Sequence, residues 1–190
     1  FFPSKRSLQC MRAWVTRCLS LGRRAGSVRA VRGRAARPRS GRTTAMAVEL
    51  PGAVVDGAWL EANLHKVKTL DCSWHMPATG RNGAQEFAQK RIEGASFFDP
   101  DLVKDETSSL PHMLPPAGAV RAALSAVGVS PADVVVVYDG AGLFSAPRAW
   151  WMLRASGHAA VAVLDGGLPL WEAEGRPLAA AACPAPSAAA

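Results

Sequence analysis

A strand that runs into a glycine-containing loop is the part of this sequence best suited to chemistry. Residues 134–137 are four valines, and Tyr138, Asp139 and Gly140 follow before an amphipathic segment at 145–156. This pattern predicts a buried strand, a tight loop and a helix. Such a loop directs backbone N–H groups at one point, where an anion or a thiolate can be held. Its first position is Asp139, with no Cys or Ser nucleophile beside it, so the loop does not predict covalent catalysis.

The four cysteines, Cys10, Cys18, Cys72 and Cys183, offer no obvious alternative chemistry. None is paired at the CxxC spacing of metal or redox sites, and they predict neither a disulfide framework nor a metal site. Cys72 lies at the end of a predicted strand. We expect it to be a buried, inert thiol rather than a nucleophile.

The positive charge of the chain belongs to its first 45 residues. The formal net charge is +7, yet residues 1–45 hold twelve of the 22 basic residues and no Asp or Glu. The rest of the chain is acidic and has no basic stripe with interleaved aromatic residues, which argues against nucleic-acid binding. No apolar run approaches the roughly 18 residues of a membrane span, so membrane insertion is not expected either.

Residues 1–45 have the composition of an organelle transit peptide. They are rich in Arg, contain Ser and lack acids, and Trp14, Val15 and Leu19 can share one helical face. Mitochondrial targeting is the favoured interpretation, with the plastid as an alternative. The chain begins with Phe1, which is not an initiator, so an untranslated leader is a further alternative. If Met46 is the start, the protein is cytoplasmic.

Strands and helices are expected to alternate along the rest of the chain. Strands are predicted at 54–56, 67–71, 95–98, from Val134, and at 161–164, and helices at 57–65, 84–91, 117–127, 145–156 and 168–174. The alternation predicts the α/β class, with a mainly parallel sheet covered by helices on both faces. Ligands of such sheets bind at the carboxyl ends of the strands, where Asp71, Asp139 and Asp165 fall. Residues 179–190 read as an Ala/Pro linker.

Several ordered blocks resemble the two-domain sulfurtransferases, the family of rhodanese and mercaptopyruvate sulfurtransferase. The blocks are residues 70–74 (LDCSW), 94–99 (GASFFD), 112–115 (HMLP), 145–151 (SAPRAWW) and 164–167 (LDGG). The resemblance implies that residues 46–178 form a rhodanese-like domain. In this family only the second domain carries the catalytic Cys, and the first has Asp at the matching position, as Asp139 does here. The chain therefore resembles the non-catalytic N-terminal half, with an absent catalytic domain to follow.

The resemblance also implies a reaction. A Cys of the second domain takes sulfur from 3-mercaptopyruvate or thiosulfate as a persulfide and passes it to cyanide or a thiol acceptor, with no metal or organic cofactor. The partners implied are the chain's own second rhodanese domain and these small molecules. The alternative function is a stand-alone rhodanese-like module that binds a partner and catalyses nothing.

Four residues match family positions that face the active-site cleft. His112 and its acidic partner Asp101 are implied to support catalysis, because a carboxylate beside an imidazole fixes its tautomer. Trp74 and Phe144 match aromatic walls that contact substrate. The ordinary alternatives are a surface histidine in a proline-rich loop and aromatic packing.

Three further expectations concern the helix at 145–156. Arg148 is predicted to pair with Asp139 or Asp165 and so to hold the helix to the sheet. Trp150 and Trp151 are adjacent, so one is expected in the core and the other at the surface, in contact with the missing domain. Ser145 after Phe144 is more typical of the mercaptopyruvate branch than of the thiosulfate branch.

Overall fold

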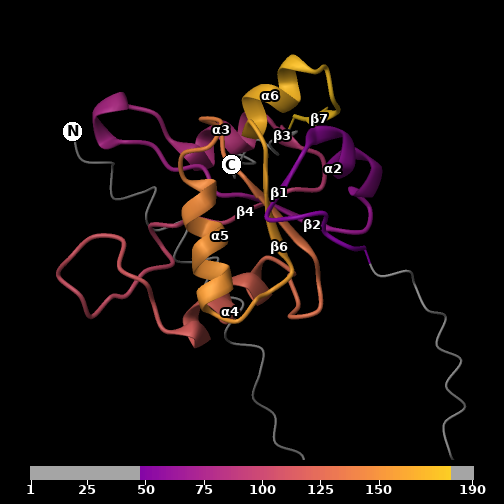
Figure 1. Cartoon of the computed structure of the whole chain (residues 1–190). Coiled ribbons are helices and arrows are strands. Elements are labelled where there is room, and N and C mark those ends of the chain that lie inside the picture. Colours follow the sequence, from indigo (N-terminus) through magenta and orange to yellow (C-terminus); the bar gives the residue numbers. More distant parts are fainter. Residues whose placement is uncertain (1–47, 181–190) are drawn as a thin grey trace, which may run out of the picture. The chain divides into compact units, whose positions relative to one another are not determined.

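A parallel five-stranded sheet forms the centre of the domain. The computed structural model describes residues 48–180, and Figure 1 shows their arrangement. The strand order is β1-β6-β5-β2-β4, and every neighbouring pair is parallel. The strands are β1 Val54–Val55, β2 Lys68–Asp71, β4 Ser96–Phe97, β5 Val135–Tyr138 and β6 Val161–Leu164. The sheet confirms the predicted class and lies where the sequence predicts it, although β1 and β4 are shorter than expected.

Helices cover both faces of this sheet, as predicted. They are α2 Gly57–Asn63, α3 Gly83–Gln89, α4 Ala117–Ala126, α5 Ala146–Ala155 and α6 Gly167–Ala173, with a 3-10 turn at Pro77–Thr79. Side chains set two of the helix starts. Asp56 accepts a hydrogen bond from the backbone N–H of Trp59, and Asn82 accepts one from Gln85. Such capping satisfies N–H groups that lack a partner inside the helix.

Successive side chains of β5 point to opposite faces of the sheet, and the core has one cluster on each face. Val135 and Val137 face a cluster that includes Val120 and Leu124 of α4 and Met152 and Leu153 of α5. Val136 and Tyr138 face the other cluster, which includes Leu60 of α2 and Trp171 of α6. Because all four β5 side chains are fully buried, this strand is covered on both faces, as its valine run predicts.

A second, antiparallel sheet of two short strands corrects the sequence-based prediction. β3 Arg91–Ile92 pairs with β7 Leu178–Ala179. Helix α3 therefore ends at Gln89 instead of extending to Arg91, and Ala179, the first residue of the predicted linker, lies in a strand. Two-residue strands have no periodicity for a sequence pattern to reveal. Residues 181–190 of that linker, and the leader at 1–45, fall outside the described residues.

The carboxyl edge of the central sheet gathers the acidic residues predicted there. Asp71 is the last residue of β2, and Asp139 and Asp165 come directly after β5 and β6. The long loop between β4 and α4 projects from the body of the domain (Figure 1). Over residues 48–180 no helix is long and apolar enough to cross a membrane, and the same residues contain no metal-binding group of three or more His, Cys, Asp or Glu side chains.

Candidate functional site

The loop after β5 encloses the Asp139 carboxylate. Asp139 is 1% exposed. Its two oxygens accept five backbone hydrogen bonds of 2.8 to 2.9 Å, and the α5 N-terminus supplies part of this positive environment. Oδ1 accepts from Ala141 and Gly142, and Oδ2 accepts from Phe144, Ser145 and Ala146. The loop thus has the anion-holding geometry that the sequence predicts, and the anion is its own side chain.

His112 and Asp101 come together, as the sequence resemblance predicts. The imidazole Nδ1 lies 2.8 Å from Oδ1 of Asp101, and the two side chains are 33% and 45% exposed. Oδ1 of Asp101 makes no hydrogen bond within the described residues, so this contact is an electrostatic one. The other oxygen, Oδ2, accepts a 2.9 Å hydrogen bond from the Trp74 indole. Asp101 therefore links the histidine to the aromatic wall.

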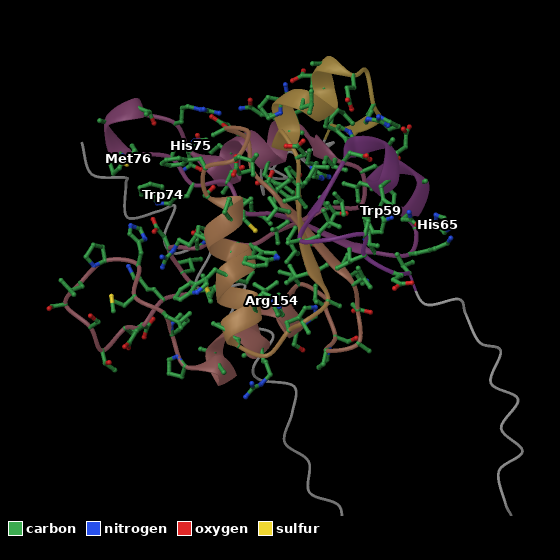
Figure 2. The ribbon with its side chains drawn as sticks, viewed as in Figure 1. Trp59, His65, Trp74, His75, Met76 and Arg154 are labelled. Carbon is green, nitrogen blue, oxygen red and sulfur yellow. The ribbon has the colours of Figure 1, made fainter. Side chains whose placement is uncertain are left out.

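Trp74 and Phe144 form that wall. Their rings are stacked with centroids 6.1 Å apart, and the Trp74 ring meets the His112 ring edge-on at 5.1 Å. Figure 2 shows Trp74, His75 and Met76 at the end of α5 away from Arg154. A cavity of about 180 Å³ opens there, lined by Trp74, Pro100, His112, Phe144, Ser145 and Arg148. Of the four predicted cleft residues, Trp74, His112 and Phe144 line this cavity. Asp101, the fourth, contacts Trp74 and His112.

Arg148 does not make the ion pair predicted for it. Its guanidinium donates a hydrogen bond to the backbone carbonyl of His112, and Asp139 is already saturated by backbone N–H groups. His112 has a φ of 56°, a left-handed conformation that is uncommon outside glycine. Arg148 thus fastens a strained backbone position instead of joining helix to sheet. Trp150 and Trp151 follow the prediction, since Trp150 packs against the core and Trp151 is exposed.

A chain of polar contacts joins β2 to the Asp139 loop. The Ser73 hydroxyl donates to the Asp71 carboxylate and accepts a 2.8 Å hydrogen bond from the N–H of Gly140. Burial raises the pKa of Asp71 above its usual value, although the bonds from Ser73 oppose this effect. Burial also raises the pKa of Tyr138, whose hydroxyl accepts a bond from Ile92. These contacts fix the position of the loop relative to the sheet.

A second charged group, which the sequence did not predict, lies beside this loop. Arg81 makes two 2.8 Å hydrogen bonds to Glu86, and the buried His75 ring contacts the same carboxylate at 3.0 Å. Arg81 also donates to the carbonyl of Gly140. The bond from Arg81 lowers the pKa of Glu86. Only the spacing of Arg81 and Glu86, with an Asn cap between them, could have signalled this group.

The Cys72 thiol is buried, as the sequence predicts. The side chain is fully buried, and burial raises the pKa of the thiol well above its usual value. A larger hollow of about 430 Å³ lies away from this site, lined in part by Arg121 of α4 and by Ser156 and His158, which follow α5.

The fold and the loop after β5 define an α/β domain built around an anion-holding loop. A family model described as "Rhodanese-like domain" matches residues 56–174. The chain belongs to the rhodanese-like domain family. It is 53% identical over 124 residues to "Thiosulfate/3-mercaptopyruvate sulfurtransferase 1, mitochondrial" of Arabidopsis thaliana, covering 64% of this chain and 33% of the relative.

An animal protein and a bacterial crystal structure are also similar to this chain. Identity to 3-mercaptopyruvate sulfurtransferase of Rattus norvegicus is 42% over 146 residues, or 73% of this chain and 49% of that protein. The crystal structure of SseA from Escherichia coli, described as a 3-mercaptopyruvate sulfotransferase of the rhodanese fold, superposes with a TM-score of 0.64 at 39% identity. The match covers 68% of this chain and 50% of SseA. The chain thus spans a third to a half of the length of these relatives.

Proposed function

We propose that this chain is the N-terminal, non-catalytic half of a sulfurtransferase. The complete protein moves sulfur from 3-mercaptopyruvate or thiosulfate to cyanide or a thiol acceptor, through a Cys persulfide in a second rhodanese domain. The named activities of the relatives support sulfur transfer, and the partial coverage of those relatives supports a further half. The chain by itself is inactive.

One observation carries this proposal: the loop that could hold a thiolate holds the Asp139 carboxylate, while a histidine–carboxylate pair stands in the wall nearby. A carboxylate has no sulfur atom, so Asp139 cannot form a persulfide. His112 lies against Trp74 in an open cavity, where an imidazole can orient or protonate a substrate held from the other side. Such a wall is complete only when a second surface brings the nucleophile.

Exposed apolar side chains at the carboxyl edge give that second surface a place to dock. Met76 follows β2, Leu143 and Phe144 follow β5, and Leu170 lies in α6, and all four are exposed. Apolar groups that gather on one edge are typical of an interface. The second rhodanese domain is the occupant we propose, and cleft substrates would then lie between it and the wall of Trp74 and Phe144.

The preferred donor is 3-mercaptopyruvate, and the proposed location is the mitochondrion. Ser145 after Phe144 supports this choice of donor over thiosulfate. The Arabidopsis relative is named as mitochondrial, and the basic, acid-free composition of residues 1–45 supports import. The plastid, or the cytoplasm with Met46 as the start, are the alternatives.

Two assays test the proposal. The purified chain, incubated with 3-mercaptopyruvate and cyanide, should form no thiocyanate above a protein-free blank. Co-expression with the Cys-containing domain encoded downstream should give turnover. Activity of the chain alone that Cys72→Ser abolishes would overturn the proposal. A transcript that ends without a second domain would favour the stand-alone binding module.

A further inference from the structure

The Asp139 carboxylate holds more than its own loop. Its Oδ2 binds the N–H groups of Phe144 and Ser145. The Ser145 hydroxyl in turn accepts a 3.1 Å hydrogen bond from the N–H of Trp74. Both aromatic residues of the cavity wall are therefore connected to one buried carboxylate, Phe144 directly and Trp74 through a single hydroxyl.

No side chain neutralises this carboxylate within the described residues. Their ion pairs do not include Asp139, so the backbone N–H groups and the α5 N-terminus compensate its charge. A buried carboxylate is costly without such donors. Conversely, five N–H groups aimed at one point are left unsatisfied if the carboxylate is removed.

The neighbouring backbone adds to the enclosure. The Asp139 carbonyl accepts a 3.0 Å hydrogen bond from Leu168. A Cβ atom on Gly167 would lie 2.5 Å from this carbonyl oxygen, so only glycine permits the approach. Because the main chain of Asp139 is held from this side, removal of the side chain should leave an enclosed space of acetate size lined by N–H groups.

We propose that Asp139 is a positioning residue, a built-in anionic ligand that holds Phe144 and Trp74 in the geometry of the cleft wall. The role rests on the proposed function, because it matters for sulfur transfer only if the wall meets substrate. Asp139, which occupies the position of a nucleophile, thus has a structural role in the cleft wall. A small carboxylate supplied from solution should be able to replace it.

Anion rescue of the Asp139→Gly chain tests this inference. In amide NMR spectra of the full 190-residue chain, the substitution should shift the signals of residues 141–146 and the Trp74 indole. Sodium formate or acetate should return them towards wild-type positions with saturation and raise the thermal midpoint. The same salts should leave wild type unchanged, since its site is filled. Asp165→Gly is the matched control, because Asp165 is exposed at the same edge, and formate should not affect it.

Each alternative result has a defined meaning. If carboxylates leave the variant's spectrum unchanged, or if chloride acts as well as formate, the inference is overturned, since chloride has a single acceptor atom and lacks the two oxygens that serve the two groups of donors. If Asp139→Gly does not fold even with formate, Asp139→Asn decides. Its oxygen can serve one group of donors only, so either residues 141 and 142 or residues 144–146 should shift selectively. A wild-type pattern at all five would overturn the inference.

A kinetic arm separates this inference from the proposed function. In the two-domain protein, Asp139→Gly should raise KM by severalfold with a smaller change in kcat, and formate should restore part of the loss. Rescue of the spectrum without any kinetic effect would overturn the role in the cleft wall. Absence of turnover in the wild-type two-domain protein would overturn the proposed function, and the rescue spectrum would still stand.

Discussion

Replacing His112 and Asp101 in the two-domain protein tests whether this wall takes part in sulfur transfer. His112→Ala removes the imidazole, and we expect kcat/KM to fall by about 10²-fold, the low end of what a positioned acid–base group contributes. The protein should still fold, because the ring is partly exposed in a loop and its main aromatic contact is the edge-on one with Trp74.

The structure sets a smaller expectation for Asp101→Asn. Its carboxylate contacts an imidazole at 2.8 Å, but the two side chains are 33% and 45% exposed, so solvent screens their attraction. Exposed pairs of this kind contribute about 0.2–1 kcal/mol, which corresponds to a loss of roughly 1.5- to 5-fold in rate. The double variant should be no slower than His112→Ala, because Asp101 acts through the histidine.

Initial rates of thiocyanate formation from 3-mercaptopyruvate and cyanide measure these effects. Trp74→Phe is an informative companion, since it keeps the stacked ring and removes the indole bond to Asp101. Wild-type kinetics in His112→Ala would show that His112 is an ordinary surface histidine with no role in catalysis. A loss with Asp101→Asn as large as with His112→Ala would refute the argument from screening.

Three further predictions concern the loop, the buried acid and the leader. Ser73→Ala should lower the free energy of unfolding by about 2 kcal/mol in urea melts, because it removes a hydrogen bond to a charged group and one from Gly140. Ser125 is exposed, so the control Ser125→Ala should change this free energy little. Equal stabilities of the two variants would contradict the prediction. Burial raises the folded-state pKa of Asp71 above its usual 3.8, so the stability contributed by its protonated form is complete below that pH and is lost as pH rises through the folded pKa. Wild type should thus weaken relative to Asp71→Asn over this window, and a difference that does not vary with pH would count against it. A fluorescent reporter fused to residues 11–45 should enter mitochondria, whereas diffuse fluorescence would favour Met46 as the start.

The sequence could predict the central sheet because its strands carry a strong local signal. The valines before Tyr138 and the apolar run that ends at Leu164 predict strands buried between two layers of helices. The strands β3 and β7 could not be predicted, since a pair of residues acquires strand geometry only from its partner. The α3 boundary was wrong for the same reason, because Arg91 pairs with Ala179, 88 positions later in the chain.

The site could be predicted only in part. The loop that encloses Asp139 follows from local glycines and a helix start, whereas the meeting of His112, Asp101 and Trp74 follows from the family resemblance and not from spacing. Arg148 shows the limit of reasoning from charge. Its partner is the backbone carbonyl of His112, a residue with an unusual φ angle, and neither feature is visible in residue types.

The filled loop after β5 also affects how the complete protein would respond to anions. A carboxylate attached to the loop by covalent bonds acts at a very high effective concentration, of order 10⁵ M or more in well-oriented cases. Free sulfur oxyanions at millimolar levels cannot compete with it. A protein with two similar rhodanese domains would therefore show anion binding and inhibition with the stoichiometry of one site. The Asp139 loop of the first domain would not take up product or donor anions at these concentrations.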